Sequence, residues 1–220
     1  MIKLTQITGE EIELNETDLV KAHFEEPRNY AYFILDEWKA QPYKDFIKKD
    51  SIILDIGANV GLFALHVLPI AKRIVCVEPT ESHNNVFKDL INDERVELES
   101  SALHDYTGKV GFHIEHVNYT MNRVNNYHAG AIEVPCITLK DLCTKYNLNK
   151  VDFCKIDIEG SEDLAITEQT VKEVSNIIKA FSIELHPRTR EMQDQYKSIF
   201  EKCGYKASYV DFNGTVYATK

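Results

Sequence analysis

The chain has 220 residues and a formal net charge of −10 at pH 7. This length suits one α/β domain with a full hydrophobic core and is short for two domains. The acidic balance disfavours a nucleic-acid partner, because nucleic acids are bound through a basic surface. No apolar run reaches the roughly 18 residues of a membrane-spanning helix, so the sequence predicts no membrane span.

The five cysteines are odd in number and scattered, without a Cys-x-x-Cys pair. This pattern favours reduced thiols over a disulfide framework. No secretory signal is visible after Met1. We therefore expect a cytoplasmic protein, and no feature of the sequence indicates an oligomeric state.

Residues 1–50 form a lead-in that we do not expect to fold independently. Apolar residues alternate in 2–7 and in 11–14, which predicts a small hairpin. Pro42 then begins a short helix that continues through Phe46 and Ile47. In residues 51–220 strand-like and helix-like stretches alternate, which predicts a doubly wound α/β domain.

The stretch Ile52–Leu65 combines a buried strand, an acid, a tight glycine turn and the start of an apolar helix. A loop that cradles phosphates needs the pattern Gly-x-Gly-x-x-Gly or a lysine after the glycines. Here the turn has Gly57 and Gly61, with Asn59 between them and Asp55 before them. The carboxylate of Asp55 would repel a pyrophosphate and attract an amino or sulfonium group.

A helix over residues 62–71, disturbed near Pro69, leads to a second strand that ends in Glu78, where an acid would hydrogen-bond a ribose diol. An acid at the glycine turn and an acid ending the second strand fit an adenosine that carries a cationic tail in place of phosphates. The sequence therefore predicts S-adenosylmethionine as the cofactor. Thr80 is the predicted N-cap of the next helix, and a third strand spans residues 96–100.

Residues 109–135 depart from the alternation of strands and helices. Two strands are predicted, around residues 110–114 and 132–134, with a polar loop at 116–130 between them. The Asn, Tyr, His and Arg side chains of this loop suit a sugar ring, so the loop either binds the methyl acceptor or is merely solvated. Its acceptor-binding candidates are Tyr119 and Arg123.

A second group of acids follows the predicted fourth strand, where Asp157 and Glu159 stand past its carboxyl end. The fifth strand brings Glu184 and His186 to the same edge of the sheet, on one shared face. The remaining elements are predicted over residues 139–146 (helix), 151–157 (strand), 177–185 (strand), 190–202 (helix), and 205–212 with 215–219 (terminal hairpin).

Four segments resemble the FkbM-type class I methyltransferases: Asp55–Gly61, Val77–Pro79, Lys155–Gly160 and Glu184–His186. The resemblance implies a Rossmann-like α/β fold with a mostly parallel seven-stranded sheet, an antiparallel last strand and helices on both faces. It further implies S-adenosylmethionine-dependent O-methylation of a sugar, glycoconjugate or natural-product hydroxyl. The expected partner is therefore a small-molecule or glycan acceptor.

The residues expected to hold the cofactor are Asp55, Gly57, Ala58, Asn59, Gly61, Glu78, Pro79 and Asp157, with Ser101 and Ala102 beside the adenine by family analogy. Methyl transfer to oxygen needs a base for the acceptor hydroxyl. His186 is the base candidate, because its ordinary pKa lies near neutrality. Asp157 and Glu159 would serve the acceptor with it.

Lys155 lies inside the fourth strand, where a buried lysine is costly without a partner. We expect an ion pair with Glu184 or Asp157, and count Lys155 and Glu184 as weaker acceptor-binding candidates. Carboxylates and one imidazole also suit a divalent cation. No close-spaced metal motif exists in the sequence, so a bound metal is not favoured.

Two other functions stay open. A nucleic-acid methyltransferase, acting on a ribose or a cap, would need a basic face. A catalytically silent S-adenosylmethionine-binding module would need Asp55 and Glu78 but not Asp157 and His186. The second group of acids therefore favours an enzyme.

Overall fold

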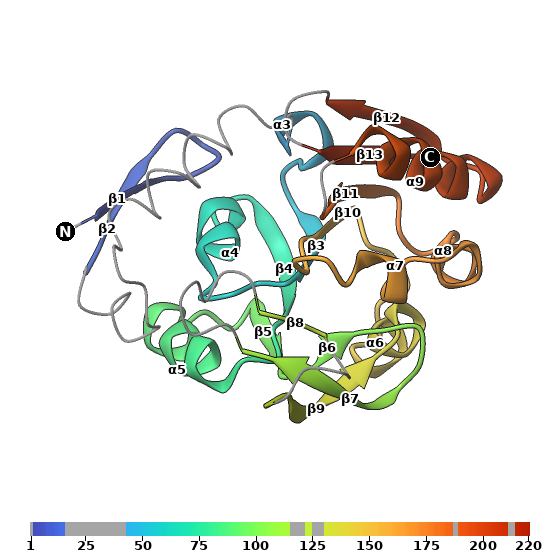
Figure 1. Cartoon of the computed structure of the whole chain (residues 1–220). Coiled ribbons are helices and arrows are strands. Elements are labelled where there is room, and N and C mark those ends of the chain that lie inside the picture. The colour runs from blue at the N-terminus through green and yellow to red at the C-terminus, as the bar shows by residue number, and fades with distance from the viewer. Residues whose placement is uncertain (1, 16–42, 115–121, 125–129, 187–188, 211–213) are drawn as a thin grey trace.

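The computed structural model describes residues 2–15, 43–114, 122–124, 130–186, 189–210 and 214–220. Its centre is a seven-stranded sheet in the order β12-β13-β11-β10-β3-β4-β5 (Figure 1). The strands are β3 (Ser51–Ile56), β4 (Ala71–Val77), β5 (Val96–Glu99), β10 (Phe153–Ile156), β11 (Ala180–Glu184), β12 (Lys206–Val210) and β13 (Thr215–Thr219). In this sheet β13 runs antiparallel to both of its neighbours, and the other neighbouring pairs are parallel. The predicted mostly parallel sheet with an antiparallel last strand is confirmed.

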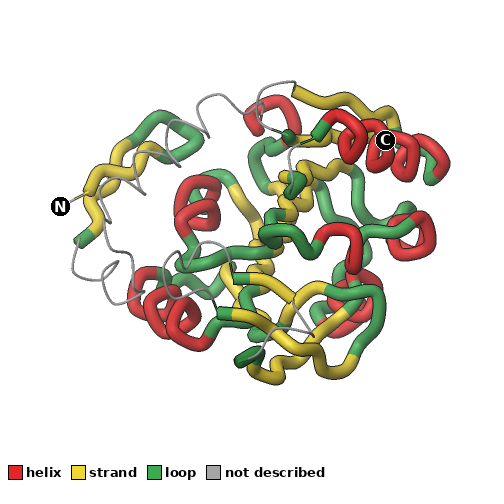
Figure 2. The backbone as a smooth tube through the Cα atoms, viewed as in Figure 1, coloured by secondary structure: helices red, strands yellow, loops and turns green. Residues whose placement is uncertain are grey.

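Helices cover both faces of this sheet, as predicted (Figure 2). Each face of the sheet has its own hydrophobic cluster. Successive side chains of a strand point to opposite faces, so Ile53 packs into one cluster and Leu54 into the other. The first face carries α3 (Tyr43–Phe46), α4 (Leu62–Val67) and α5 (Glu81–Leu90). The second carries α6 (Leu139–Lys145), α7 (Glu162–Ala165), α8 (Glu168–Val174) and α9 (Arg190–Lys202).

The first helix of the domain is shorter than its apolar pattern predicts. Helix α4 ends at Val67, and Ala71, which the sequence pattern placed in the helix, already begins β4. Pro69 lies between them and has no backbone N–H to continue the helix. The connection from the glycine turn to the second strand is therefore compact.

The predicted N-terminal hairpin forms, with β1 (Ile2–Thr5) paired to β2 (Glu11–Leu14). It packs against α4, because Ile7 N donates to His66 O at 2.8 Å and Nδ1 of His66 lies 2.7 Å from Thr5 O. Leu4 and Leu14 are buried in the same cluster as the first face of the sheet. The hairpin thus buttresses the helix that follows the glycine turn.

The predicted short helix is α3, which packs its aromatic rings on the sheet. The Tyr43 ring lies 5.2 Å from Phe63 and 5.7 Å from Phe153, measured between centroids, and Phe46 stacks on Tyr217. Such aromatic pairs stabilise a core beyond the area they bury. Residues 16–42, with the aromatic stretch before this helix, lie outside the described residues.

A second, four-stranded sheet in the order β6-β9-β7-β8 lies between β5 and α6 in the sequence. Its strands are β6 (Ala102–Leu103), β7 (Gly108–His113), β8 (Arg123–Val124) and β9 (Ile132–Ile137). The sequence pattern predicts only β7 and β9, since β6 and β8 are too short for a visible periodicity. Strand β8 lies inside the predicted polar loop, and Tyr119 lies outside the described residues.

Gly61 offers a test of how tightly the glycine turn packs. A Cβ on Gly61 would lie 2.6 Å from the Phe87 ring and from Ile91 Cδ1, at a backbone φ of +87°. Gly61→Ala should lower the free energy of unfolding by about 2–5 kcal/mol, from the left-handed backbone and from overpacking together. Urea unfolding followed by circular dichroism measures this loss.

Gly9→Ala is the matched control, because Gly9 has a similar φ of +94° and nothing within 4 Å of the added Cβ. It carries the backbone strain alone, so we expect a loss of about 1–2 kcal/mol. Equal losses in the two variants would contradict the packing argument.

Candidate functional site

The glycine turn after β3 presses directly against the chain that leaves β10. A Cβ on Gly57 would lie 1.8 Å from the carbonyl oxygen of Asp157, so only glycine fits. The amides of Gly57 and Ala58 both donate to Val77 O, at 2.9 and 3.0 Å. The turn is thus fixed to β4 on one side and to β10 on the other, which brings the two predicted groups of acids together.

Asn59 takes the place that a second glycine holds in a dinucleotide loop. Its φ is +52°, and its Oδ1 accepts a hydrogen bond from Val60 N at 2.8 Å. Asparagine tolerates this left-handed conformation better than most residues because its side chain bonds the nearby backbone. The backbone amide of Asn59 is turned toward the next strand, where it donates to Glu78 Oε2 at 3.0 Å.

Glu78 lies buried at the end of β4 with both carboxylate oxygens held. Its Oε1 accepts from Thr80 N at 2.8 Å and lies 3.5 Å from His83 Nδ1. Burial alone would raise the pKa of Glu78, but the bonds from His83 and Thr80 outweigh it and lower the pKa. Glu78 is therefore a charged acceptor in a fixed orientation, and Pro79 follows it. Thr80 occupies the predicted N-cap position of α5, without a side-chain capping bond.

Asp55 is fully buried at the same edge of the sheet. Neither of its carboxylate oxygens accepts a hydrogen bond from any residue that the structure describes. Burial raises the pKa of Asp55 to about 6, against the opposing charge of Lys155. A buried carboxylate without donors is costly unless a ligand supplies them.

Lys155 stands beside Asp55 in the parallel register of β3 and β10. Its Nζ lies 3.1 Å from Asp157 Oδ2, so the predicted ion pair with Asp157 forms. Burial would lower the pKa of Lys155, but the charges of Asp157 and Asp55 outweigh it and raise the pKa well above its ordinary value. The lysine is therefore a fixed cation that joins the two groups of acids.

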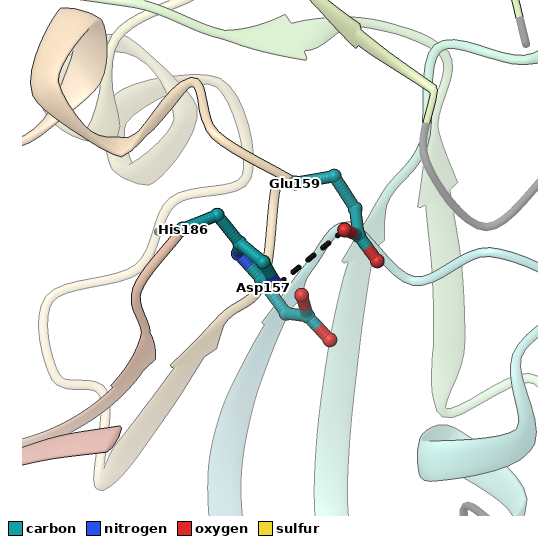
Figure 3. A group of neighbouring side chains, drawn as sticks. All are labelled: Asp157, Glu159 and His186. Atoms are coloured by element: carbon teal, nitrogen blue, oxygen red, sulfur yellow. Dashed lines mark ion pairs between the residues drawn. The ribbon is translucent and has the colours of Figure 1, made fainter. Parts of the chain in front are cut away.

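The second group of acids gathers round the ring of His186, and the carboxylates of Asp157 and Glu159 lie together beside it (Figure 3). His186 Nε2 is 3.4 Å from Glu159 Oε2 and 3.7 Å from Glu184 Oε1. The structure thus brings together the three predicted catalytic residues and Glu184, from the ends of β10 and β11.

A further acid, Glu162, faces the other ring nitrogen. Its Oε1 lies 3.2 Å from His186 Nδ1 and accepts from Gly160 N at 3.2 Å. Burial would lower the pKa of His186, but Glu162 and Glu159 outweigh it and raise the pKa to about 9. A proton on each ring nitrogen suits this position, because a carboxylate oxygen faces each of the two nitrogens. Sequence analysis missed Glu162, and its signal was an acid two residues after the tight turn at Gly160.

Asp157, Glu159 and His186 each place one potential ligand atom within 4.8 Å of the others. Distances of this size are also found where a cationic side chain, with no metal ion, balances the charge of neighbouring carboxylates. In this cluster the His186 ring lies between carboxylates and, when protonated, supplies the positive charge that a metal ion would otherwise provide. The expectation that no metal is bound stays a prediction.

Of the residues predicted near an adenine, Ser101 follows β5 and Ala102 begins β6. Ser101 donates its hydroxyl to Glu99 Oε1 at 2.6 Å and lines a cavity of about 620 Å³ together with Lys145 and Tyr146. The Ala102 side chain packs in the core of the small sheet. Its side chain is therefore turned into that core, and only its backbone remains as a contact for an adenine.

Arg123, in β8, lies over the turn at Gly160. A Cβ on Gly160 would meet Arg123 Cδ at 3.9 Å and His186 Cβ at 3.8 Å. Val124 N donates to Ser161 Oγ at 2.9 Å and ties β8 to the same turn. The structure thus places this acceptor-binding candidate beside the acids, while Tyr119 lies outside the described residues.

Comparison with known proteins agrees with this arrangement. The methyltransferase FkbM domain model matches residues 55–207. The chain belongs to the FkbM methyltransferase family. Class I methyltransferases of this type use S-adenosylmethionine as the methyl donor. The sequence matches no curated protein.

Solved structures share the fold of this FkbM-family chain at low sequence identity. The methyltransferase FkbM from Methylobacillus flagellatus is 15% identical, with a TM-score of 0.53 over 77% of this chain and 43% of that one. The chain thus spans less than half the length of that protein. A chain from the complex between the Haloferax volcanii Trm112 methyltransferase activator and a methyltransferase is 9% identical, with a TM-score of 0.50 over 94% and 99%.

Within the described residues, none of the helices combines the length and the apolar character needed to cross a membrane. The longest of them, α9, has 13 residues.

Replacing Asp55 tests its buried charge. Its pKa of about 6 in the folded chain lies above the ordinary 3.8, so the folded state holds the proton more tightly and loses stability as the pH rises from about 4 to 6. Asp55→Asn should therefore match the parent near pH 3.5, below the unfolded pKa, and be more stable at pH 8, by roughly 3 kcal/mol at most. Urea unfolding at both pH values measures this difference.

Asp152→Asn is a control of opposite sign. Burial would raise the pKa of Asp152, but Lys150, the Ile52 amide and Lys179 lower it. This carboxylate stabilises the fold above its unfolded pKa, and that stability is lost as the pH falls. The variant should be less stable than the parent at pH 8, and a gain there would contradict the electrostatic reasoning.

Proposed function

We propose that this chain is an S-adenosylmethionine-dependent O-methyltransferase that acts on a hydroxyl of a sugar, glycoconjugate or natural product. One observation carries the proposal: the buried carboxylate of Asp55, which has no hydrogen-bond donor among the described residues, lies beside the Gly57 turn. In the same turn, the backbone amide of Asn59 donates a hydrogen bond to Glu78, so a second carboxylate with a fixed orientation lies at this site.

These residues fit S-adenosylmethionine and do not fit a phosphorylated nucleotide. The ammonium group of the cofactor would supply the donors that Asp55 lacks, and the free lone pairs of Glu78 would accept the ribose hydroxyls. Asp157, on the other side of the turn, adds negative charge that a sulfonium favours. When bound, this cofactor supplies an activated methyl group.

The task left to the protein is to orient the acceptor and remove its hydroxyl proton. Asp157, Glu159 and His186 stand past the ends of β10 and β11, on the same side as the glycine turn. We assign the handling of that proton to these three side chains, with Arg123 and Glu184 at their margin.

Glu78→Gln tests the cofactor half of the proposal. Loss of a charged hydrogen bond of about 1.5–3 kcal/mol should weaken S-adenosylmethionine binding by about 10- to 100-fold. Isothermal titration calorimetry measures the affinity, and Glu97→Gln, at a part-buried pair with Arg73 away from the glycine turn, is the control. An unchanged affinity for Glu78→Gln would remove the ribose assignment.

The acceptor class is tested by transfer of labelled methyl onto methyl glycosides, small phenols and RNA. We expect product from a glycoside or another hydroxyl compound, and His186→Ala should keep cofactor binding while losing turnover by about 100-fold or more. Product from RNA alone, with a steep dependence on salt, would instead indicate a nucleic-acid methyltransferase.

A further inference from the structure

Glu162 is the buried acid in the site that the proposed function has not used. Its side chain is 1% exposed, on the first turn of α7, and it faces His186 Nδ1 at 3.2 Å. Its second oxygen, Oε2, has no hydrogen-bond partner among the described residues. The hydroxyl of Tyr196, also fully buried, lies near this carboxylate and is likewise without a partner there.

Both nitrogens of the His186 ring face carboxylate oxygens. Nδ1 faces Glu162, and Nε2 faces Glu159 at 3.4 Å and Glu184 at 3.7 Å. A carboxylate only accepts hydrogen bonds, and a neutral imidazole has one nitrogen without a proton. A neutral ring would therefore direct a lone pair at an anionic oxygen, whereas the doubly protonated ring satisfies both sides.

A ring with a proton on each nitrogen has no lone pair with which to take another proton. The neighbouring Glu159 is differently placed, because one of its oxygens faces His186 and the other is turned away from the ring (Figure 3). Burial, with the nearby charge of Asp157, raises the pKa of Glu159 to about 7. A carboxylate with such a pKa accepts protons well near neutrality.

We propose that Glu162 is a positioning residue, which holds the His186 imidazole with a proton on both nitrogens and leaves Glu159 to take the proton from the acceptor hydroxyl. The inference rests on the proposed function. In this step the O–H bond of the acceptor breaks and the proton moves to the Glu159 carboxylate. The electron pair stays on oxygen and forms the bond to the methyl carbon, as the carbon–sulfur pair returns to sulfur.

Several charged and titratable groups besides Glu162 stand around the His186 ring. Glu159 and Asp157 act on its charge, and Glu184 lies 3.7 Å from Nε2. One step further out, Lys155 pairs with Asp157, Tyr196 lies near Glu162, and Arg123 lies over the turn at Gly160. Glu162 is the one that bonds Nδ1, on the side away from Glu159. Its removal should therefore change the ring more than the removal of Glu184, which is 3.7 Å from Nε2.

The first test is the titration of the His186 ring by nuclear magnetic resonance, in the full chain without cofactor. The ring signal is assigned with His186→Gln. We expect a doubly protonated ring up to about pH 8 in the parent, and a midpoint lower by about one pH unit or more in Glu162→Gln, because an opposite charge is lost. Glu184→Gln is the control and should shift the midpoint less.

A singly protonated ring at neutral pH in the parent, or equal midpoints in the parent and Glu162→Gln, would overturn the inference. Glu162→Asp keeps the charge and should restore much of the parent midpoint, which separates a charge effect from a folding defect. The titration tests the pairing of Glu162 with His186 even if calorimetry shows no binding of S-adenosylmethionine. A failure of the proposed function and a failure of this inference therefore appear in different experiments.

The second test measures turnover with a methyl glycoside acceptor. Glu159→Gln should bind S-adenosylmethionine within about twofold of the parent and lose about 100-fold or more in kcat. Glu162→Gln should lower kcat with little change in KM and move the alkaline limb of the pH profile to lower pH. Parent-like turnover of Glu159→Gln, or turnover that a chelator abolishes and Mg²⁺ restores, would overturn the role of Glu159.

Discussion

The backbone contact between Gly57 and Asp157 is the constraint on which the site depends. Strands β3 and β10 are neighbours in the sheet, and their carboxyl ends leave in the same direction. The absence of a side chain at Gly57 lets the two chain turns touch, since a Cβ there would lie 1.8 Å from a carbonyl oxygen. The acid before the glycine turn and the acids after β10 therefore belong to one site.

The acidic side chains in this site outnumber the cationic ones. Lys155 and His186 are its buried or half-buried cations, and Asp55, Asp157, Glu159, Glu162 and Glu184 surround them. Burial, together with the nearby acids, raises the pKa values of Asp55 and Glu159 above their ordinary values. A ligand with a positive charge would lower the cost of keeping these carboxylates ionised, which is the physical reason why a sulfonium cofactor suits this site.

Much of this site could be predicted from the sequence, because the order and the ends of the strands can be read from local patterns. Strand ends in a parallel sheet meet at one edge, so Asp55, Glu78, Asp157 and His186 were expected there. The cost of burying a lone charge indicated a carboxylate partner for Lys155, either Glu184 or Asp157, and the structure shows the pair with Asp157. These inferences needed only local patterns and the order of the strands.

Other features depend on contacts that no local pattern reveals. Glu162 lies on a helix of 4 residues, too short for periodicity, and its role comes from its distance to a ring 24 residues later. Strands β6 and β8 have 2 residues each and exist only because β9 and β7 pair with them.

Glu159 has a left-handed backbone, with φ of +53°, followed by Gly160 at +95°. A residue with a side chain loses roughly 1–2 kcal/mol in this conformation relative to glycine. Glycine or asparagine would relax the backbone but remove the carboxylate. Variants selected for heat resistance alone would thus drift away from glutamate at this position. Under the role proposed for Glu159, selection for turnover would oppose that drift, and the left-handed backbone is the stability lost by keeping the carboxylate there.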